Sequence, residues 1–162
     1  MTRRDLISHL KFYQALEPRA VDATENGDTI DLLGYDACTF MVNIGSFAAN
    51  VDAGSYYIIG LQHGTASAAG VDAWTDVGAQ NVLHSVIGSG GATSTITSGI
   101  WLTINSASMS GTVQQIGYLG DTTHRYVRLV LSIVLTPTST LIGAVCVLGK
   151  PSVWPVVGVV GH

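Results

Sequence analysis

The chain has 162 residues, of which 47% are apolar and only 11% are charged, and its formal net charge is −4 at pH 7. A chain of this length forms one domain and buries about two-thirds of its unfolded surface, so it needs neither disulfides nor a metal to fold. The acidic balance excludes direct nucleic-acid binding through a basic groove, which requires a positive face to displace counterions.

The few charges are unevenly placed. No Lys or Arg lies between Arg19 and Arg125, and no charged residue of any kind lies between Asp76 and Asp121. A soluble monomer normally scatters charges over such a length of surface. We therefore expect the chain to sit in an oligomer or a larger assembly.

The N-terminal residues carry a helical period, because Leu6, Leu10 and Tyr13 recur at helical spacing before Pro18 ends the pattern. This predicts a short amphipathic helix over residues 5–16, or an arm that becomes ordered on a partner. A helix folded onto its own domain is an equal alternative. Four of the seven basic residues lie within residues 1–19: Arg3, Arg4, Lys11 and Arg19.

The period then changes to two. In ACTFMVNI, Cys38, Phe40, Val42 and Ile44 share one face, which is typical of a half-buried strand. Further strands are predicted over 29–33, 55–62, 73–77, 81–87, 99–104 and 112–119, separated by loops rich in Gly, Ala, Ser, Asn and Thr. The spacing indicates an all-β, antiparallel β-sandwich or barrel.

The longest apolar run follows Arg125 and Arg128. Residues 127–135 alternate, TPTST turns the chain, and residues 141–148 return, so the pair is predicted to form a core hairpin. The run is far too short to cross a membrane. Arg128 lies on the mixed face of the first strand, and Arg125 begins the strand near Asp121. A local ion pair and contact with an acidic neighbour both remain open for these arginines.

The last residues, 151–162, contain two prolines and an apolar group around Trp154, which predicts an extended tail that docks as a strand. The expected organisation is therefore a helix or arm over 1–19, a β domain over 20–150 and a C-terminal tail over 151–162. Cys38 and Cys146 lie in apolar strands and are expected to be buried thiols; a bridge between two sheets is the alternative. No secretory leader pattern is present.

Motifs that carry chemistry are absent from the sequence. It has no HxH, HExxH, CxxC or GxSxG pattern, and GSGGATS fails the spacing of a dinucleotide-binding loop. His63 and His84 are expected to be satisfied or exposed, and Asp72 and Asp76 to be solvated. We therefore expect no catalytic residue, cofactor or metal, although a hydrolase site assembled from distant residues is not excluded by the sequence.

Several segments resemble small structural proteins encoded near the head genes of tailed bacteriophages. The resemblance runs from Phe12 to Pro151 and is carried by FYQALEPRAVDATENGDTIDLLGYDACTFMVNIG, WTDV, IGYLGDTTHRYVRLVLSIV and IGAVCVLGKP. Its most specific parts are the YLGD…RYVR strand and the AVCVLGKP strand.

The resemblance implies a virion protein, most like a head decoration or cement protein, with a β-sandwich of the jelly-roll type. It also implies synthesis in the host bacterial cytoplasm, a homotrimer on the capsid surface, and the major capsid protein as partner, with no membrane or nucleic-acid contact. The candidate partner-binding residues are Arg3, Arg4, Leu6, Leu10, Lys11, Tyr13, Arg19, Arg125, Arg128 and Trp154.

A second interpretation is a carbohydrate- or receptor-binding module, or an adaptor, of a phage spike, neck or tail. In the carbohydrate-binding version, Trp74 and Trp101 serve as stacking platforms. A core or interface position is the favoured alternative for each of these rings.

Overall fold

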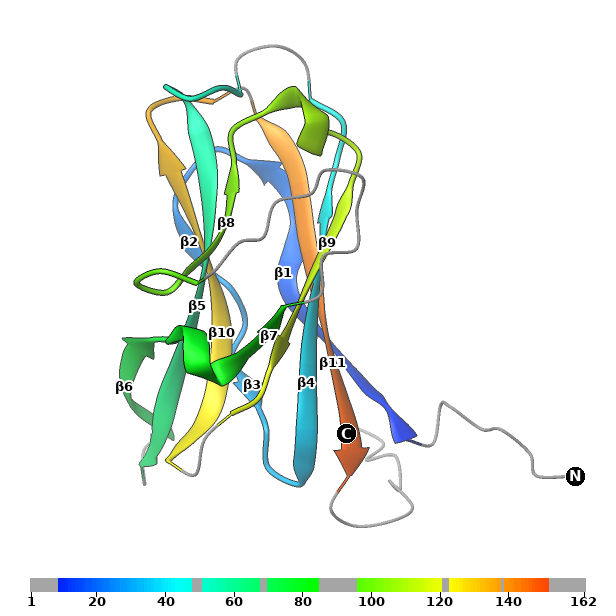
Figure 1. Ribbon diagram of the computed structural model, residues 1–162, viewed down its shortest axis with the longest axis vertical. Helices are drawn as coiled ribbons and strands as arrows, with labels where there is room; N and C mark the ends of the chain where they lie inside the picture. Colours follow the sequence, from blue (N-terminus) through cyan, green and yellow to red (C-terminus); the bar gives the residue numbers. More distant parts are fainter. Residues whose placement is uncertain are drawn as a thin grey trace, which may run out of the picture.

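The structure is a computed structural model that describes residues 9–47, 51–67, 70–84, 96–120, 123–137 and 139–151. Over these residues the chain is all-β, and its strands form two antiparallel sheets that do not close into a barrel (Figure 1). This confirms the predicted all-β class. The described residues contain no α-helix; they include the short 3₁₀ turns η2 (Ala79–Asn81) and η3 (Ala107–Met109).

Sheet A has five strands. Their order across the sheet is β1 (Lys11–Val21), β11 (Thr140–Pro151), β4 (Tyr35–Ile44), β9 (Val113–Tyr118) and β7 (Val82–His84). Sheet B has the order β2 (Glu25–Asn26), β10 (His124–Val134), β5 (Tyr56–Ser67) and β6 (Gly70–Asp76). In addition, β3 (Ile30–Asp31) pairs with β10, and β8 (Ile100–Ile104) pairs with β5.

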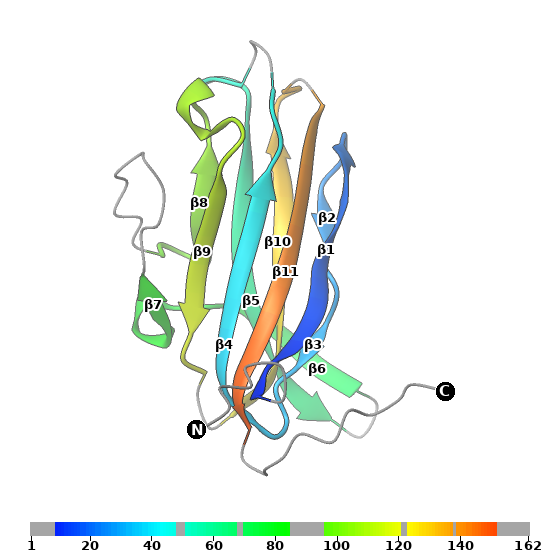
Figure 2. The ribbon, with the colours of Figure 1, turned by 90° about the vertical axis from the view of Figure 1, so that its right-hand side faces the viewer.

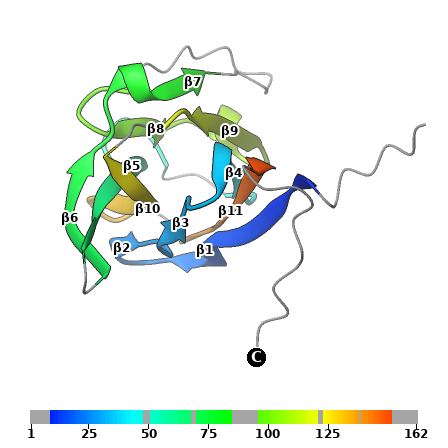
Figure 3. The ribbon, with the colours of Figure 1, turned by 90° about the horizontal axis from the view of Figure 1, so that it is seen from below.

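The two sheets lie face to face, as the views from the side and along the strands show (Figures 2 and 3). Alternate residues of each long strand are buried between them, so that Phe40 and Cys146 of sheet A and Tyr57 and Leu129 of sheet B are fully enclosed. This is the two-residue alternation expected from the sequence. Because one face of each sheet is buried against the other sheet, each sheet also has one outer face.

The predicted core hairpin is wrong. The two apolar strands it joined belong to different sheets, because β10 pairs with β5 while β11 pairs with β1 and β4. The connection near Thr136 and Pro137 therefore carries the chain from one sheet to the other. Both strands bury an apolar face in the common core, and this periodicity does not distinguish a hairpin from a crossover.

The predicted N-terminal helix is also wrong over residues 11–16, which belong to β1. Lys11 to Val21 pairs with β11 along the edge of sheet A, with register shifts beside Leu16. Sheet pairing overrides a short helical period, because the edge of β11 offers a backbone partner for each residue in register. The predicted domain boundary at residue 19 falls inside this strand; residues 1–8 and 152–162 lie outside the described residues.

The remaining strand predictions are confirmed, with shifted ends. Strands β4 to β6 and β8 to β11 occupy the expected segments, and β3 is shorter than predicted. Strand β7 lies in its expected segment, of which residues 85–87 fall outside the described residues. The short strand β2 was not expected, because two residues carry no measurable period.

Candidate binding surfaces

The outer face of sheet A carries no charged side chain on its three central strands. Its outward positions on β11, β4 and β9 are Leu141, Gly143, Val145, Val147, Gly149, Ala37, Thr39, Met41, Asn43, Val113, Gln115 and Gly117. Ten large apolar side chains are exposed among the described residues, and six belong to this face: Phe12, Met41, Leu83, Val113, Leu141 and Val145. Exposed apolar side chains grouped in this way are typical of interaction surfaces.

A groove of about 600 Å³ runs over this face between β1, β11 and β4. Its lining includes Phe12, Pro18, Met41 and Val145. Gly143 forms part of its floor, and a Cβ there would lie 2.9 Å from Pro18. The absence of a side chain at Gly143 therefore lets the edge strand β1 lie close against β11.

A chain of contacts joins three strands on the outer face of sheet B. The Arg128 guanidinium of β10 lies over the Trp74 ring of β6, 4.2 Å from its centroid. Its Nε and Nη2 donate to Gln62 Oε1 at 3.1 and 2.8 Å, and Gln62 Nε2 donates to Asp76 Oδ1 at 3.0 Å. We call these four residues the Arg128 ladder. Burial lowers the pKa of Arg128.

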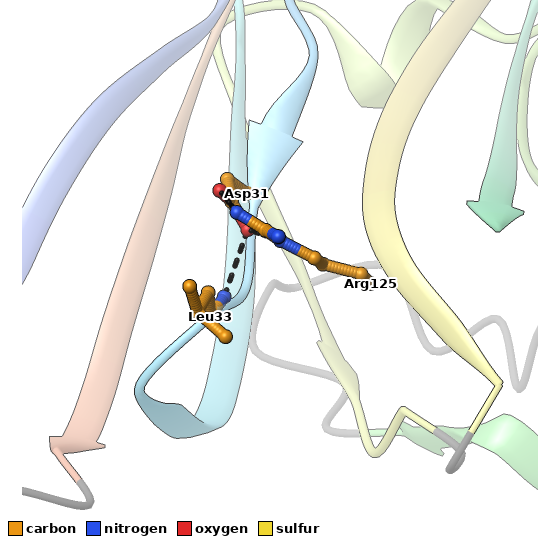
Figure 4. A network of polar contacts seen from close by, with 3 residues as sticks. All are labelled: Asp31, Leu33 and Arg125. Atoms are coloured by element: carbon orange, nitrogen blue, oxygen red, sulfur yellow. Dashed lines mark hydrogen bonds and ion pairs between the residues drawn. The ribbon is translucent and has the colours of Figure 1, made fainter. Parts of the chain in front are cut away.

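Arg125 forms a different contact from the one expected. It pairs with Asp31 of β3, where Nε donates to Oδ1 at 2.7 Å and Nη2 to Oδ2 at 2.5 Å (Figure 4). The backbone N–H of Leu33 also donates to Asp31 Oδ1. The hydrogen bond from Arg125 and that from Leu33 hold the pKa of Asp31 below its usual value. Asp121, the partner considered from the sequence, lies outside the described residues.

The other predicted binding residues do not gather into one site. Leu10 packs beside Gly149, Lys11 lies over the Tyr13 ring at 4.6 Å from its centroid, and Arg19 pairs with Glu25 of β2. A hydrogen bond with Tyr13 raises the pKa of Lys11. Arg3, Arg4, Leu6 and Trp154 fall outside the described part of the chain.

The sequence did not predict one group of side chains that the structure brings together, made of one tyrosine and two histidines. The Tyr118 hydroxyl lies 2.8 Å from His63 Nδ1, and the His63 ring stacks on His124 with centroids 3.6 Å apart and planes at 6°. His63 is thus satisfied, as expected, whereas the side chain of His84 is not described. A cavity of about 650 Å³ borders Tyr118 and His124. The pairing of β5 with β10 in sheet B, and the packing of β9 of sheet A against that sheet, bring these rings together.

Cys38 and Cys146 are both buried, as expected, but lie in adjacent strands of sheet A rather than in opposite sheets. Their sulfur atoms are 3.3 Å apart. The contact with Cys146, together with burial, raises the pKa of Cys38 strongly. The two residues are therefore a pair of free thiols in the interior.

The structure places the two candidate stacking platforms differently. Trp101 is 3% exposed and belongs to the core, so it is unavailable for sugar stacking. Trp74 is half-buried, and Arg128 lies over its ring. Within the described ranges, no three His, Cys, Asp or Glu residues cluster as metal ligands, and no helix is long and apolar enough to cross a membrane.

Comparison of the chain with protein families, curated proteins and solved structures gave no match.

Proposed function

We propose that the chain is a non-enzymatic structural protein of a tailed-bacteriophage virion. In this proposal it is a capsid decoration, or cement, protein that binds the outside of the head across neighbouring capsid subunits. The resemblance of its sequence to such proteins supplies the class, and the two antiparallel sheets are compatible with the jelly-roll type of β-sandwich that the class implies. The partner is the major capsid protein, and the location is the virion surface.

The outer face of sheet A, which is uncharged on its three central strands, is the observation that carries this proposal. A face with six exposed large apolar side chains is costly in water and suits permanent burial against another copy of the chain. We assign it to the interface of a homo-oligomer, with a trimer favoured. Sheet B, whose outer face presents Arg128, is then left to face the shell.

A cement protein of this kind stabilises the shell by multivalency rather than by chemistry. Each contact with a capsid subunit can be weak, but a trimer must release several contacts at once to dissociate. Linked contacts of this type raise the effective affinity by about 10² or more. No reacting group is required for this role.

The proposal is tested by the number of copies of the chain in purified particles of its parent virus. Quantitative mass spectrometry measures the chain relative to the major capsid protein. We expect a ratio near one, or a regular fraction of it, because a decoration protein repeats across the shell. Absence from the particles would overturn the virion assignment.

A few copies per particle would instead favour the alternative, an adaptor or receptor-binding module of a spike, neck or tail. The half-buried Trp74 beside polar side chains is the feature that favours a carbohydrate-binding version. A glycan array then separates the two functions: binding that Trp74→Ala abolishes supports the alternative, whereas an array without signal supports the structural role.

A further inference from the structure

The guanidinium of Arg128 is oriented by its neighbours but is not neutralised by them. Arg19 and Arg125 each form an ion pair, with Glu25 and Asp31 respectively. Arg128 has no ion pair among the described residues, and its only polar partner there is the neutral amide of Gln62. A half-buried cation without a carboxylate is unfavourable, because burial removes part of its hydration.

The ladder also fixes the direction of the guanidinium. Gln62 occupies two of the five N–H donors of Arg128 and is itself held by Asp76, while Trp74 supports the plane of the group. Trp74 can lie there because position 64 is glycine: a Cβ would be 3.3 Å from the Trp74 ring and 2.5 Å from Val71. A guanidinium fixed in this way loses little entropy when it binds a further acceptor.

We propose that Arg128 is the anchor of a carboxylate-binding site, and that its occupant is an acidic segment of a partner protein. A planar guanidinium with free donors matches a carboxylate in a two-point contact. A stacked saccharide is disfavoured because Arg128 lies over the Trp74 ring. A phosphopeptide is disfavoured because phosphate recognition generally uses clustered arginines, whereas Arg125 is already paired with Asp31.

This inference does not rest on the virion assignment, since any partner with an exposed acidic segment satisfies it. The titration below uses the purified chain and no virus particle. Its failure would leave the copy-number experiment unaffected, and the reverse also holds.

The test is an NMR titration of the full chain with a hexaglutamate peptide blocked at both ends, monitoring the Nε–H resonances of the arginines. We expect a saturable shift centred on Arg128 and no shift with blocked hexaglutamine. Arg128→Gln should weaken hexaglutamate binding by about tenfold or more, because the positive charge and the planar set of guanidinium N–H donors are both lost. The affinity of Arg128→Lys for hexaglutamate should lie between those of wild type and Arg128→Gln, because lysine keeps the charge but not the planar set of donors.

Lys150→Gln is the matched control, since it also removes one positive charge, from an exposed side chain at the end of β11 that lies outside the ladder. We expect it to bind hexaglutamate as wild type does. Equal weakening by Lys150→Gln and Arg128→Gln would overturn the proposal, as would the absence of any shift at Arg128. Tighter binding of a phosphoserine peptide or of sialyllactose than of hexaglutamate would also overturn it. If Arg128→Gln fails to fold, Arg128→Lys is compared with Lys150→Gln: weaker binding by Arg128→Lys supports the proposal, and equal binding overturns it.

Discussion

Replacing Leu141 by Glu should break self-association while leaving the fold intact. Leu141 lies on the outer face of sheet A with 60% of its side chain exposed. Its backbone pairs with β1 opposite Ala20, and its carbonyl accepts from the N–H of Gly45 at 2.7 Å. A glutamate keeps these backbone bonds, so the free energy of unfolding should change by no more than about 0.5 kcal/mol.

The effect on association follows from the exposed part of the side chain. Full burial of a leucine side chain contributes about 1.5–3 kcal/mol relative to exposure. Because 60% of Leu141 is still exposed in the single chain, an interface gains about 1–2 kcal/mol from covering it. Loss of that amount weakens association by about 5- to 30-fold for each copy in the interface. The cost of desolvating the new carboxylate adds to this value.

Sedimentation velocity over a range of concentrations measures the change. Leu135→Glu is the matched control, because Leu135 is 74% exposed and lies after β10, away from the outer face of sheet A. We expect wild type and Leu135→Glu to form the same oligomer and Leu141→Glu to dissociate at higher concentration. A wild-type chain that is monomeric throughout, or equal dissociation of the two variants, would refute the assignment of sheet A as the interface.

Three further results are expected. Leu129→Ala should lower the free energy of unfolding by about 3–5 kcal/mol in urea titration, because Leu129 is fully buried between the sheets; a loss below about 1 kcal/mol would contradict that position. Asp31 has a pKa below its ordinary 3.8, so its contribution to stability is present above pH 3.8 and disappears as the pH falls through the lowered value. Asp31→Asn should therefore flatten the stability profile below pH 3.8, and an unchanged profile would show that the pair with Arg125 is absent in solution. Finally, Cys38 and Cys146 should resist alkylation by iodoacetamide at pH 8 until urea unfolds the chain, because both are buried and the pKa of Cys38 is raised; rapid labelling of the native chain would contradict this.

The candidate surfaces were only partly predictable. The shortage of charge along the chain predicted a surface covered by another molecule. The structure shows that uncharged outward residues gather on β4, β9 and β11 of sheet A, while their coverage by a partner stays a prediction. Arg128 was predicted to project from the mixed face of its strand, and it does so. Its partners Gln62 and Trp74 were not predictable, because they belong to other strands whose register depends on the whole sheet.

By itself, the sequence determined which positions of each strand face the core. The alternation around Phe40 and Leu129 is a local property, because successive side chains of a strand point to opposite faces and the apolar ones are buried. Only the tertiary structure decided which strands are neighbours: it separated β10 from β11, drew residues 11–16 into sheet A, and joined Arg125 to Asp31 across 94 positions of sequence. These pairings are long-range, and many arrangements of amphipathic strands bury the same apolar faces, so a pattern within one strand carries no information about its partner.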